Sequence, residues 1–242
     1  ILSRNTTWTL TRDTSLGLNF APTTFYDGQG FMVPKSLGVS HATELNGATV
    51  CVQSGTTTEL NLADYFRSKG MTFQPVVIES FDEVNAAFFA GRCDGYTTDA
   101  SGLAGVRSTL ASNPDDYVIL PELVSQEPLA PAVAHGDDQW FDYLKWTVYA
   151  LIQAEQLGLT SANVDQHMND PDPNIQRLLG TSGDVGAMLG VDAKWGYNIV
   201  KQIGNYGELF ERNLGNGSAL KLERGLNALW TEGGLMYAPP IR

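Results

Sequence analysis

The pattern of apolar and polar positions predicts strands and helices, and these alternate in the middle of the chain. Residues 48–53 form an apolar, β-branched run bounded by Ser54 and Gly55, which is typical of a strand. The next segment, 56–67, places Leu60 and Phe66 on one face of a helix. The same patterns predict further strands over 73–78, 93–97 and 117–120, and helices over 81–90 and 100–110. Such strand–helix alternation indicates crossover units on a parallel sheet.

The two ends of the chain differ from this middle part. Turn chemistry occupies 19–22 and 27–30, and the short apolar run 31–33 ends at Pro34. The last hundred residues are predicted to be mainly helical, with a long amphipathic helix over 140–157 and shorter ones over 174–179, 194–203, 206–213 and 226–230. The chain is therefore interpreted as a compact α/β middle flanked by two segments that need each other.

Composition excludes several classes of function. Of the 242 residues 43% are hydrophobic, which is enough for a substantial core, and the net charge of −12 disfavours a nucleic-acid partner. No uninterrupted apolar run of about 18 residues occurs, so no membrane insertion is expected. Three histidines without ligand spacing predict no metal, and nothing indicates a cofactor. The two cysteines, Cys51 and Cys93, form either one disulfide or two buried thiols.

The first candidate site is the strand–turn–helix over 50–59. A glycine at the turn, Gly55, lets the backbone approach a ligand, and a helix N-terminus favours an anion. Thr56, Thr57 and Thr58 add hydroxyl groups at the same place. The structural alternative is a threonine N-cap completed by Glu59 in a capping box.

Two further candidates are single charged residues. Asp99 follows a predicted parallel strand, where open α/β sheets place their ligands, and a carboxylate there suits an ammonium group. Its alternative role is the N-cap of the helix that starts at Ala100. Arg12 follows a polar segment that contains Asn5 and Thr7, and its guanidinium can grip a carboxylate with two hydrogen bonds. Its alternative is an ordinary surface arginine.

Together these segments resemble a known family. The resemblance runs in order through 3–13, 20–26, 50–59, 92–99, 220–227 and 237–242. It is a resemblance to the periplasmic polar amino acid-binding proteins of ABC transporters (solute-binding protein family 3), particularly the general L-amino acid-binding branch. It implies the α/β fold of type II periplasmic binding proteins, with two lobes, parallel-sheet cores and a two-strand hinge.

The resemblance also implies roles for the candidate residues. A free L-amino acid would be held in the cleft between the lobes and passed to the permease of an ABC importer, and the protein would be periplasmic and not an enzyme. An oxidising periplasm favours a disulfide between Cys51 and Cys93. The ligand-binding residues would be Arg12 for the α-carboxylate, with Asn5, Thr7 and Thr57, and Asp99 for the α-ammonium, with Thr56 and Thr58 assisting.

The resemblance implies lobe boundaries and one departure from the family. The first lobe would combine residues 1–34 and 134–242, and the inserted second lobe would span 35–133, with hinge strands near 32–35 and 130–135. The family's opening strands and helices are absent before residue 5, so the first lobe is expected to be incomplete. We therefore expect weakened ligand binding, or self-association that covers the exposed strands.

Two other functions stay open from sequence alone. One is a truncated fragment that acts as an interaction or structural module with a vestigial cleft. The other is a lyase that uses cleft carboxylates on the same fold. No catalytic residue is predicted, because no Gly-x-Ser-x-Gly elbow occurs and His135 and His167 fit hinge or surface positions.

Overall fold

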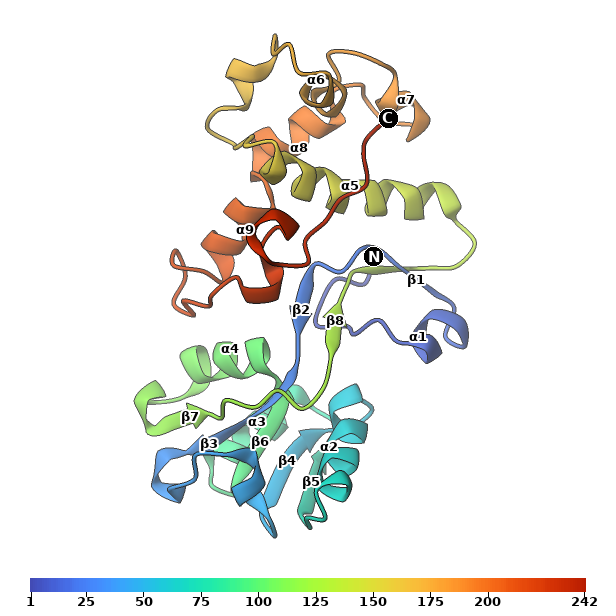
Figure 1. The fold of residues 1–242 in the computed structure, drawn as a ribbon. Coiled ribbons are helices and arrows are strands. Elements are labelled where there is room, and N and C mark those ends of the chain that lie inside the picture. Colours follow the sequence, from blue (N-terminus) through green and yellow to red (C-terminus); the bar gives the residue numbers. More distant parts are fainter. The chain divides into compact units, whose positions relative to one another are not determined.

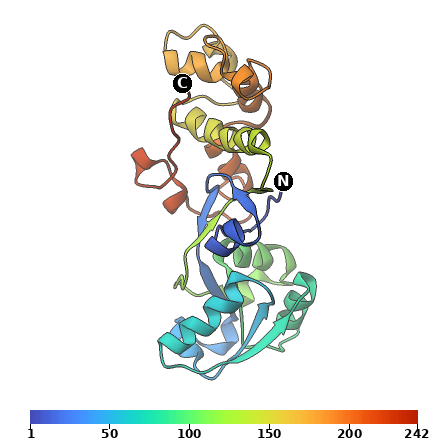
Figure 2. The ribbon, with the colours of Figure 1, turned by 90° about the vertical axis from the view of Figure 1, so that its right-hand side faces the viewer.

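The structure, a computed structural model that describes residues 1–242, divides into two compact units. The first combines Ile1–Phe25 with Ala130–Arg242, and the second is Tyr26–Leu129. Figures 1 and 2 show the second unit as the part that carries the sheet and the first as mainly helical. The chain therefore passes between the units twice, after Phe25 and after Leu129.

The second unit is built on a five-stranded sheet of order β5-β4-β6-β3-β7. β4 runs parallel to β5 and β6, as the sequence predicts, whereas β3 pairs antiparallel with both β6 and β7. Parallel neighbouring strands need a crossover connection, which is usually a helix. No crossover helix precedes β3, so nothing requires it to run parallel to the other strands. The strands are β3 (Gln29–Pro34), β4 (Thr49–Gln53), β5 (Gln74–Ile78), β6 (Gly95–Asp99) and β7 (Tyr117–Ile119).

Helices cover both faces of this sheet, so its central strands are buried on both sides. Phe31 of β3 packs in the core that contains Phe66 of α2, while the next residue, Met32, packs with Phe88 of α3 and Leu103 of α4. This alternation follows from the two-residue period of a strand. The helices are α2 (Thr57–Ser68), α3 (Phe81–Phe89) and α4 (Ala100–Leu110).

The first unit is a set of helices beside a small antiparallel pair of strands. Its main core surrounds α5, with Leu178 and Leu179 of α6 and Trp195 and Val200 of α8. The strand pair is β1 (Leu18–Phe20) with β9 (Ala132–Ala134). The helices are α1 (Leu10–Thr14), α5 (Asp138–Gln156), α6 (Pro173–Leu179), α7 (Val185–Met188), α8 (Trp195–Ile203) and α9 (Tyr206–Asn213).

Two sequence predictions are wrong in this unit. Residues 19–20, predicted as part of a turn, belong to β1, because pairing with β9 and burial of Phe20 stabilise the extended chain there. The helix predicted over 226–230 is replaced by two short 3-10 turns, Gly225–Asn227 and Trp230–Glu232. Leu229 lies between them and pairs with Met236 in a β-bridge, which a helix would prevent.

A short strand pair lies where the chain passes between the units. β2 (Phe25–Asp27) pairs with β8 (Glu127–Leu129). Glu127 and Leu129 are buried, although β8 is only three residues long. No helix of this chain is long and apolar enough to cross a lipid bilayer.

Within the first unit, an ion pair anchors the C-terminal segment to α5. Both Nη atoms of Arg224 donate to the Glu155 carboxylate of α5, at 2.9 and 3.2 Å, and its Nε donates to the Asn227 carbonyl at 2.9 Å. The guanidinium lies 5.2 Å from the ring centroid of Tyr206 and 5.0 Å from that of Phe210. A planar, bidentate and stacked cation of this kind is not replaceable by lysine.

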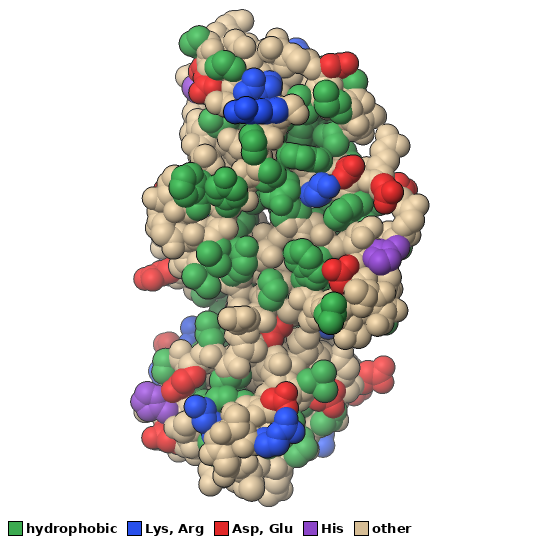
Figure 3. All heavy atoms as spheres, turned by 45° about the vertical axis from the view of Figure 1, so that its right-hand side comes forward, with side chains coloured by type: hydrophobic (Ala, Val, Ile, Leu, Met, Phe, Trp, Pro, Cys, Tyr) green, Lys and Arg blue, Asp and Glu red, His purple; other side chains and the backbone are tan.

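Apolar side chains are also exposed on the first unit. The space-filling view shows hydrophobic side chains gathered over the helical part of the molecule (Figure 3). Met188 at the end of α7 is 73% exposed, Ile203 at the end of α8 is 42% exposed and Trp140 of α5 is 40% exposed. Trp140 and Leu189 line a cavity of about 540 Å³ beside α5.

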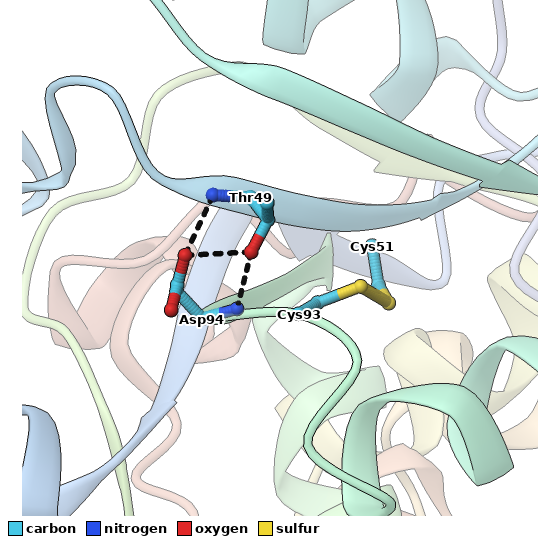
Figure 4. The surroundings of a disulfide bond; sticks show 4 residues. All are labelled: Thr49, Cys51, Cys93 and Asp94. Atoms are coloured by element: carbon cyan, nitrogen blue, oxygen red, sulfur yellow. Dashed lines mark hydrogen bonds between the residues drawn. A yellow bond between two sulfur atoms is a disulfide. The ribbon is translucent and has the colours of Figure 1, made fainter.

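A disulfide and a pair of polar side chains join β4 to the two residues that directly precede β6 (Figure 4). Cys51 and Cys93 are bonded, with 5.7 Å between their Cα atoms, which confirms the predicted disulfide. Next to it, the backbone N–H and the hydroxyl of Thr49 donate to Asp94 Oδ2 at 2.7 and 2.6 Å. These hydrogen bonds hold the pKa of Asp94 below its ordinary value.

Removing the disulfide will destabilise the second unit. Its two cysteines are 42 residues apart, and closing a loop of that length in the unfolded chain contributes about 4 kcal/mol. We expect the double variant Cys51→Ala/Cys93→Ala to lose a similar free energy of unfolding in urea titrations. A reducing agent should lower the stability of the unmodified protein and leave that of the variant unchanged.

The Asp94–Thr49 contact will contribute stability that depends on pH. Because folding lowers the pKa of Asp94 below 3.8, its contribution is present above that pH and is lost as the pH falls through the lower pKa of the folded state. We therefore expect Asp94→Asn to unfold more easily than the unmodified protein at pH 7, and the difference to shrink below about pH 4. A constant difference across urea titrations at several pH values would contradict this.

Candidate ligand-binding site

The candidate residues divide between the two units. Thr56, Thr57, Thr58 and Asp99 lie in the second unit, at the carboxyl ends of β4 and β6, and Asn5, Thr7 and Arg12 lie in the first. In the second unit, the turn from β4 to α2 is made by Gly55, whose φ of +70° is a left-handed conformation that suits glycine. This turn sets the three threonines at the start of α2.

Thr56 is the N-cap of α2, as the structural alternative predicts. Its hydroxyl donates to the Gln53 carbonyl at 2.7 Å and accepts from the Glu59 N–H at 3.2 Å. Glu59 accepts from the N–H of Gly55 at 2.8 Å and not from that of Thr56, so the predicted capping box is displaced by one residue. The Thr56 hydroxyl is thus committed to the turn.

Thr57 and Thr58 are held by the first residues of two strands, Glu127 of β8 and Gln29 of β3. The Thr57 hydroxyl donates to Glu127 Oε2 at 3.1 Å. Thr58 is buried, and its carbonyl accepts from Gln29 Nε2 at 3.0 Å. The first turn of α2 is therefore tied to both β8 and β3.

Asp99 ends β6 and occupies the N-cap position of α4, but its side chain does not cap the helix. Asp27 takes that role, because both the N–H and the hydroxyl of Ser101 donate to its Oδ2. The N-cap alternative for Asp99 is thus wrong. Asp99 is only 6% exposed. Burial of Tyr96 raises the pKa of its hydroxyl, and the charge of Asp99 raises it further.

Sequence reasoning missed three polar residues beside these candidates. Glu127 and Gln29 are almost fully buried, at 2% and 0% exposed, and burial raises the pKa of the partly buried Asp27. For Asp27 and Gln29 a signal was present in the sequence, since both lie just before the apolar run 31–33. The turn residues Gly28 and Gly30 concealed it by suggesting an exposed loop.

In the first unit, Arg12 lies in the short helix α1, whose N-cap is Thr9. Its Nη1 donates to the Thr7 carbonyl at 2.9 Å. A guanidinium has five N–H donors, so this contact leaves the group able to bind a carboxylate. Thr7 is buried whereas Asn5 is exposed, so the two predicted partners of Arg12 lie in different surroundings.

The described chain contains no cluster of three or more histidine, cysteine, aspartate or glutamate side chains that could hold a metal ion. The second-unit residues instead bring together a helix N-terminus, hydroxyl groups and buried carboxylates. Helix N-termini and hydroxyls bind anions, and carboxylates bind cations, so a ligand with both charges suits this chemistry.

Known structures define the class of the fold. A periplasmic binding protein of an ABC transporter from Brucella ovis, solved with glutathione bound, superposes with a TM-score of 0.96 and is 54% identical, over 99% of this chain and 75% of that one. A cysteine-binding protein from Campylobacter jejuni has the same fold, with a TM-score of 0.52 and 22% identity over 62% of this chain and 57% of that one. The chain thus has the fold of the type II periplasmic binding proteins.

Curated relatives narrow this class to a family. The general L-amino acid-binding periplasmic protein AapJ of Rhizobium johnstonii is 62% identical over all of this chain and 71% of its own length. The glutamate/glutamine/aspartate/asparagine-binding protein BztA of Rhodobacter capsulatus is 55% identical over all of this chain and 72% of its own length. No protein-family model matches the chain. The chain belongs to the family of periplasmic amino acid-binding proteins of ABC transporters, as the sequence resemblance predicts.

Thr56 should stabilise the protein as the N-cap of α2. Replacing it with valine removes the hydroxyl that caps α2, and loss of an N-cap typically costs about 1 kcal/mol. We expect Thr56→Val to lower the free energy of unfolding by about that amount in urea titrations. Thr56→Ser keeps the hydroxyl and serves as the control. Equal stability of the valine and serine variants would contradict the capping role.

Proposed function

We propose that this protein binds a free L-amino acid in the periplasm and presents it to the permease of an ABC importer. Asp99 carries the proposal: it is a buried carboxylate that leaves the capping of α4 to Asp27 and lies at the carboxyl end of β6. The names of the relatives, which describe L-amino acid binding, support the same function.

The recognised part of the ligand is its zwitterionic head. Arg12 binds the α-carboxylate, because a guanidinium matches a carboxylate with two hydrogen bonds, and Asp99 binds the α-ammonium. Glutathione, bound in the Brucella ovis relative, carries the same head on its glutamyl residue. Asn5, Thr7, Thr57 and Thr58 complete the proposed contacts, whereas Thr56, whose hydroxyl caps α2, assists by holding the turn.

Binding in this proposal changes the balance between conformations of the protein. In this proposal the hinge is formed by β2 and β8, where the chain passes between the units, in place of the segments near 32–35 and 130–135 expected from the sequence. A ligand that is held by Arg12 of one unit and Asp99 of the other favours the conformation in which both contacts form. The permease then recognises that conformation. Catalysis has no part in the proposal, since the relatives are named as binding proteins.

Isothermal titration of the purified protein against a panel of L-amino acids tests the proposal. We expect binding of several amino acids and none of their N-acetyl derivatives, which lack the α-ammonium. Arg12→Ala and Asp99→Asn should each weaken binding about 100-fold, since each removes a charged hydrogen bond. Arg67→Ala, which changes an exposed arginine on α2, should leave the affinity unchanged.

Three results would overturn the proposal. No binding of any amino acid, together with a self-associated mass in solution, would favour an interaction or structural module. Turnover of a bound amino acid would favour the lyase. Equal binding of N-acetylated and free amino acids would exclude recognition of the zwitterionic head.

A further inference from the structure

The chain is held by α9 just before it leaves the first unit at Phe25. Tyr206, the first residue of α9, donates its hydroxyl proton to the Thr24 carbonyl at 2.8 Å. Phe210, one turn further along α9, stacks on the ring of Phe25, with 6.2 Å between the ring centroids and 7° between the ring planes. Both α9 side chains are buried, at 7% and 3% exposed. Since Phe25 begins β2, α9 holds the first-unit end of that strand.

A single cation contacts both of these rings. The Arg224 guanidinium lies 5.2 Å from the ring centroid of Tyr206 and 5.0 Å from that of Phe210. Glu155 of α5 fixes the guanidinium with two hydrogen bonds, and the side chains of this ion pair are 19% and 14% exposed. Removal from water strengthens the attraction between a cation and an aromatic ring. Arg224 lies in the segment 220–227 that carries the sequence resemblance, and the proposed function gives this segment no role.

Gly207 shows how closely α9 approaches this ion pair. A β-carbon at this position would lie 2.6 Å from Glu155 Oε1 and 3.2 Å from Arg224 Nη1. Any other residue would therefore push the carboxylate away from the guanidinium. Glycine is an unfavourable residue in a helix, and this close approach accounts for its presence in α9.

α9 is itself attached to the chain that follows α5. Asn205 caps α9 by accepting from the Glu208 N–H at 2.8 Å, and its Nδ2 donates to the Leu159 carbonyl at 2.7 Å. The Glu208 carboxylate accepts from the hydroxyl of Ser161 at 2.6 Å. These contacts are separate from the ion pair, so α9 is a fixed support for the start of β2.

We propose that Arg224, Tyr206 and Phe210 are positioning residues that fix the first-unit end of the hinge and thereby increase the affinity for the amino acid. This inference rests on the proposed function, in which β2 and β8 form the hinge. A loosely held hinge strand would let the ligand-free protein sample more orientations of its two units. The binding-competent orientation would then be a smaller fraction of the total, and the apparent affinity falls in proportion to that fraction.

Removing the Tyr206 hydroxyl tests the proposal. Tyr206→Phe keeps the ring but loses the hydrogen bond to Thr24, and we expect it to weaken binding of the best amino acid about threefold in isothermal titration. Arg224→Lys keeps the charge but loses the bidentate contact with Glu155 and the planar contact with the rings, so it should weaken binding about tenfold.

Tyr197 provides a matched control. It lies on α8 in the same unit, and its hydroxyl donates to Asp165 Oδ1 at the same distance of 2.8 Å. Tyr197→Phe should leave the affinity unchanged. Equal losses of affinity in Tyr197→Phe and Tyr206→Phe, or no loss in Tyr206→Phe, would overturn the proposal.

A measurement without ligand separates this proposal from the proposed function. Spin labels on cysteines at two exposed positions, Lys69→Cys in the second unit and Ser182→Cys in the first, report the distances between the units. In the ligand-free labelled protein, we expect Tyr206→Phe to broaden the distance distribution and Tyr197→Phe to leave it unchanged. If no amino acid binds, the proposed function fails, but the width of the distribution still measures how firmly the hinge is held. Equal widths in all three proteins would overturn the positioning role.

Discussion

The antiparallel pairing of β3 with β6 places the polar groups of the second unit. Gln29 lies opposite Asp99 in that register, and Phe31 lies opposite Thr97. Because side chains alternate along a strand, a shift of one residue would turn the buried Phe31 and Met32 to the wrong faces. The apolar core of the sheet therefore fixes the register, and the register in turn places Gln29 beside Thr97 and Thr58.

Buried carboxylates near this edge of the sheet need several donors each, and different elements supply them. Asp27 accepts from Gly28 and Ser101, and Glu127 accepts from Thr57 and Asn61. Removing a carboxylate from water is expensive unless such donors replace the water. The start of α2, the start of α4 and the strand pair β2–β8 are thus linked through side chains, and each constrains the others.

Much of the second unit was predictable from the sequence, because local patterns decide it. The helix at 100–110 matches α4 at both ends, and the helices at 56–67 and 81–90 match α2 and α3 to within one residue at each end. The direction of β3 was not predictable, since it depends on pairing with β6, a strand more than sixty residues away. The predicted lobe boundaries and ligand contacts remain predictions.

The candidate site was predictable only in part, for a related reason. Strand ends and helix starts mark Thr56 and Asp99 in the sequence, but which side chain caps α4 depends on Asp27, which is distant along the chain. Glu127 stands in a stretch with no periodic pattern, between Ser125 and Pro128. Its importance comes from burial and from contacts to α2, and both arise only in the folded protein.

The disulfide also restricts the relative motion of β4 and β6 in the folded second unit. It joins β4 to the start of β6, and these are the two strands whose far ends carry the α2 threonines and Asp99. A covalent tie limits how far neighbouring strands can slide or separate during thermal fluctuation. The two parts of the candidate site on this unit would then be preorganised before any ligand arrives, and less conformational entropy would be lost on binding.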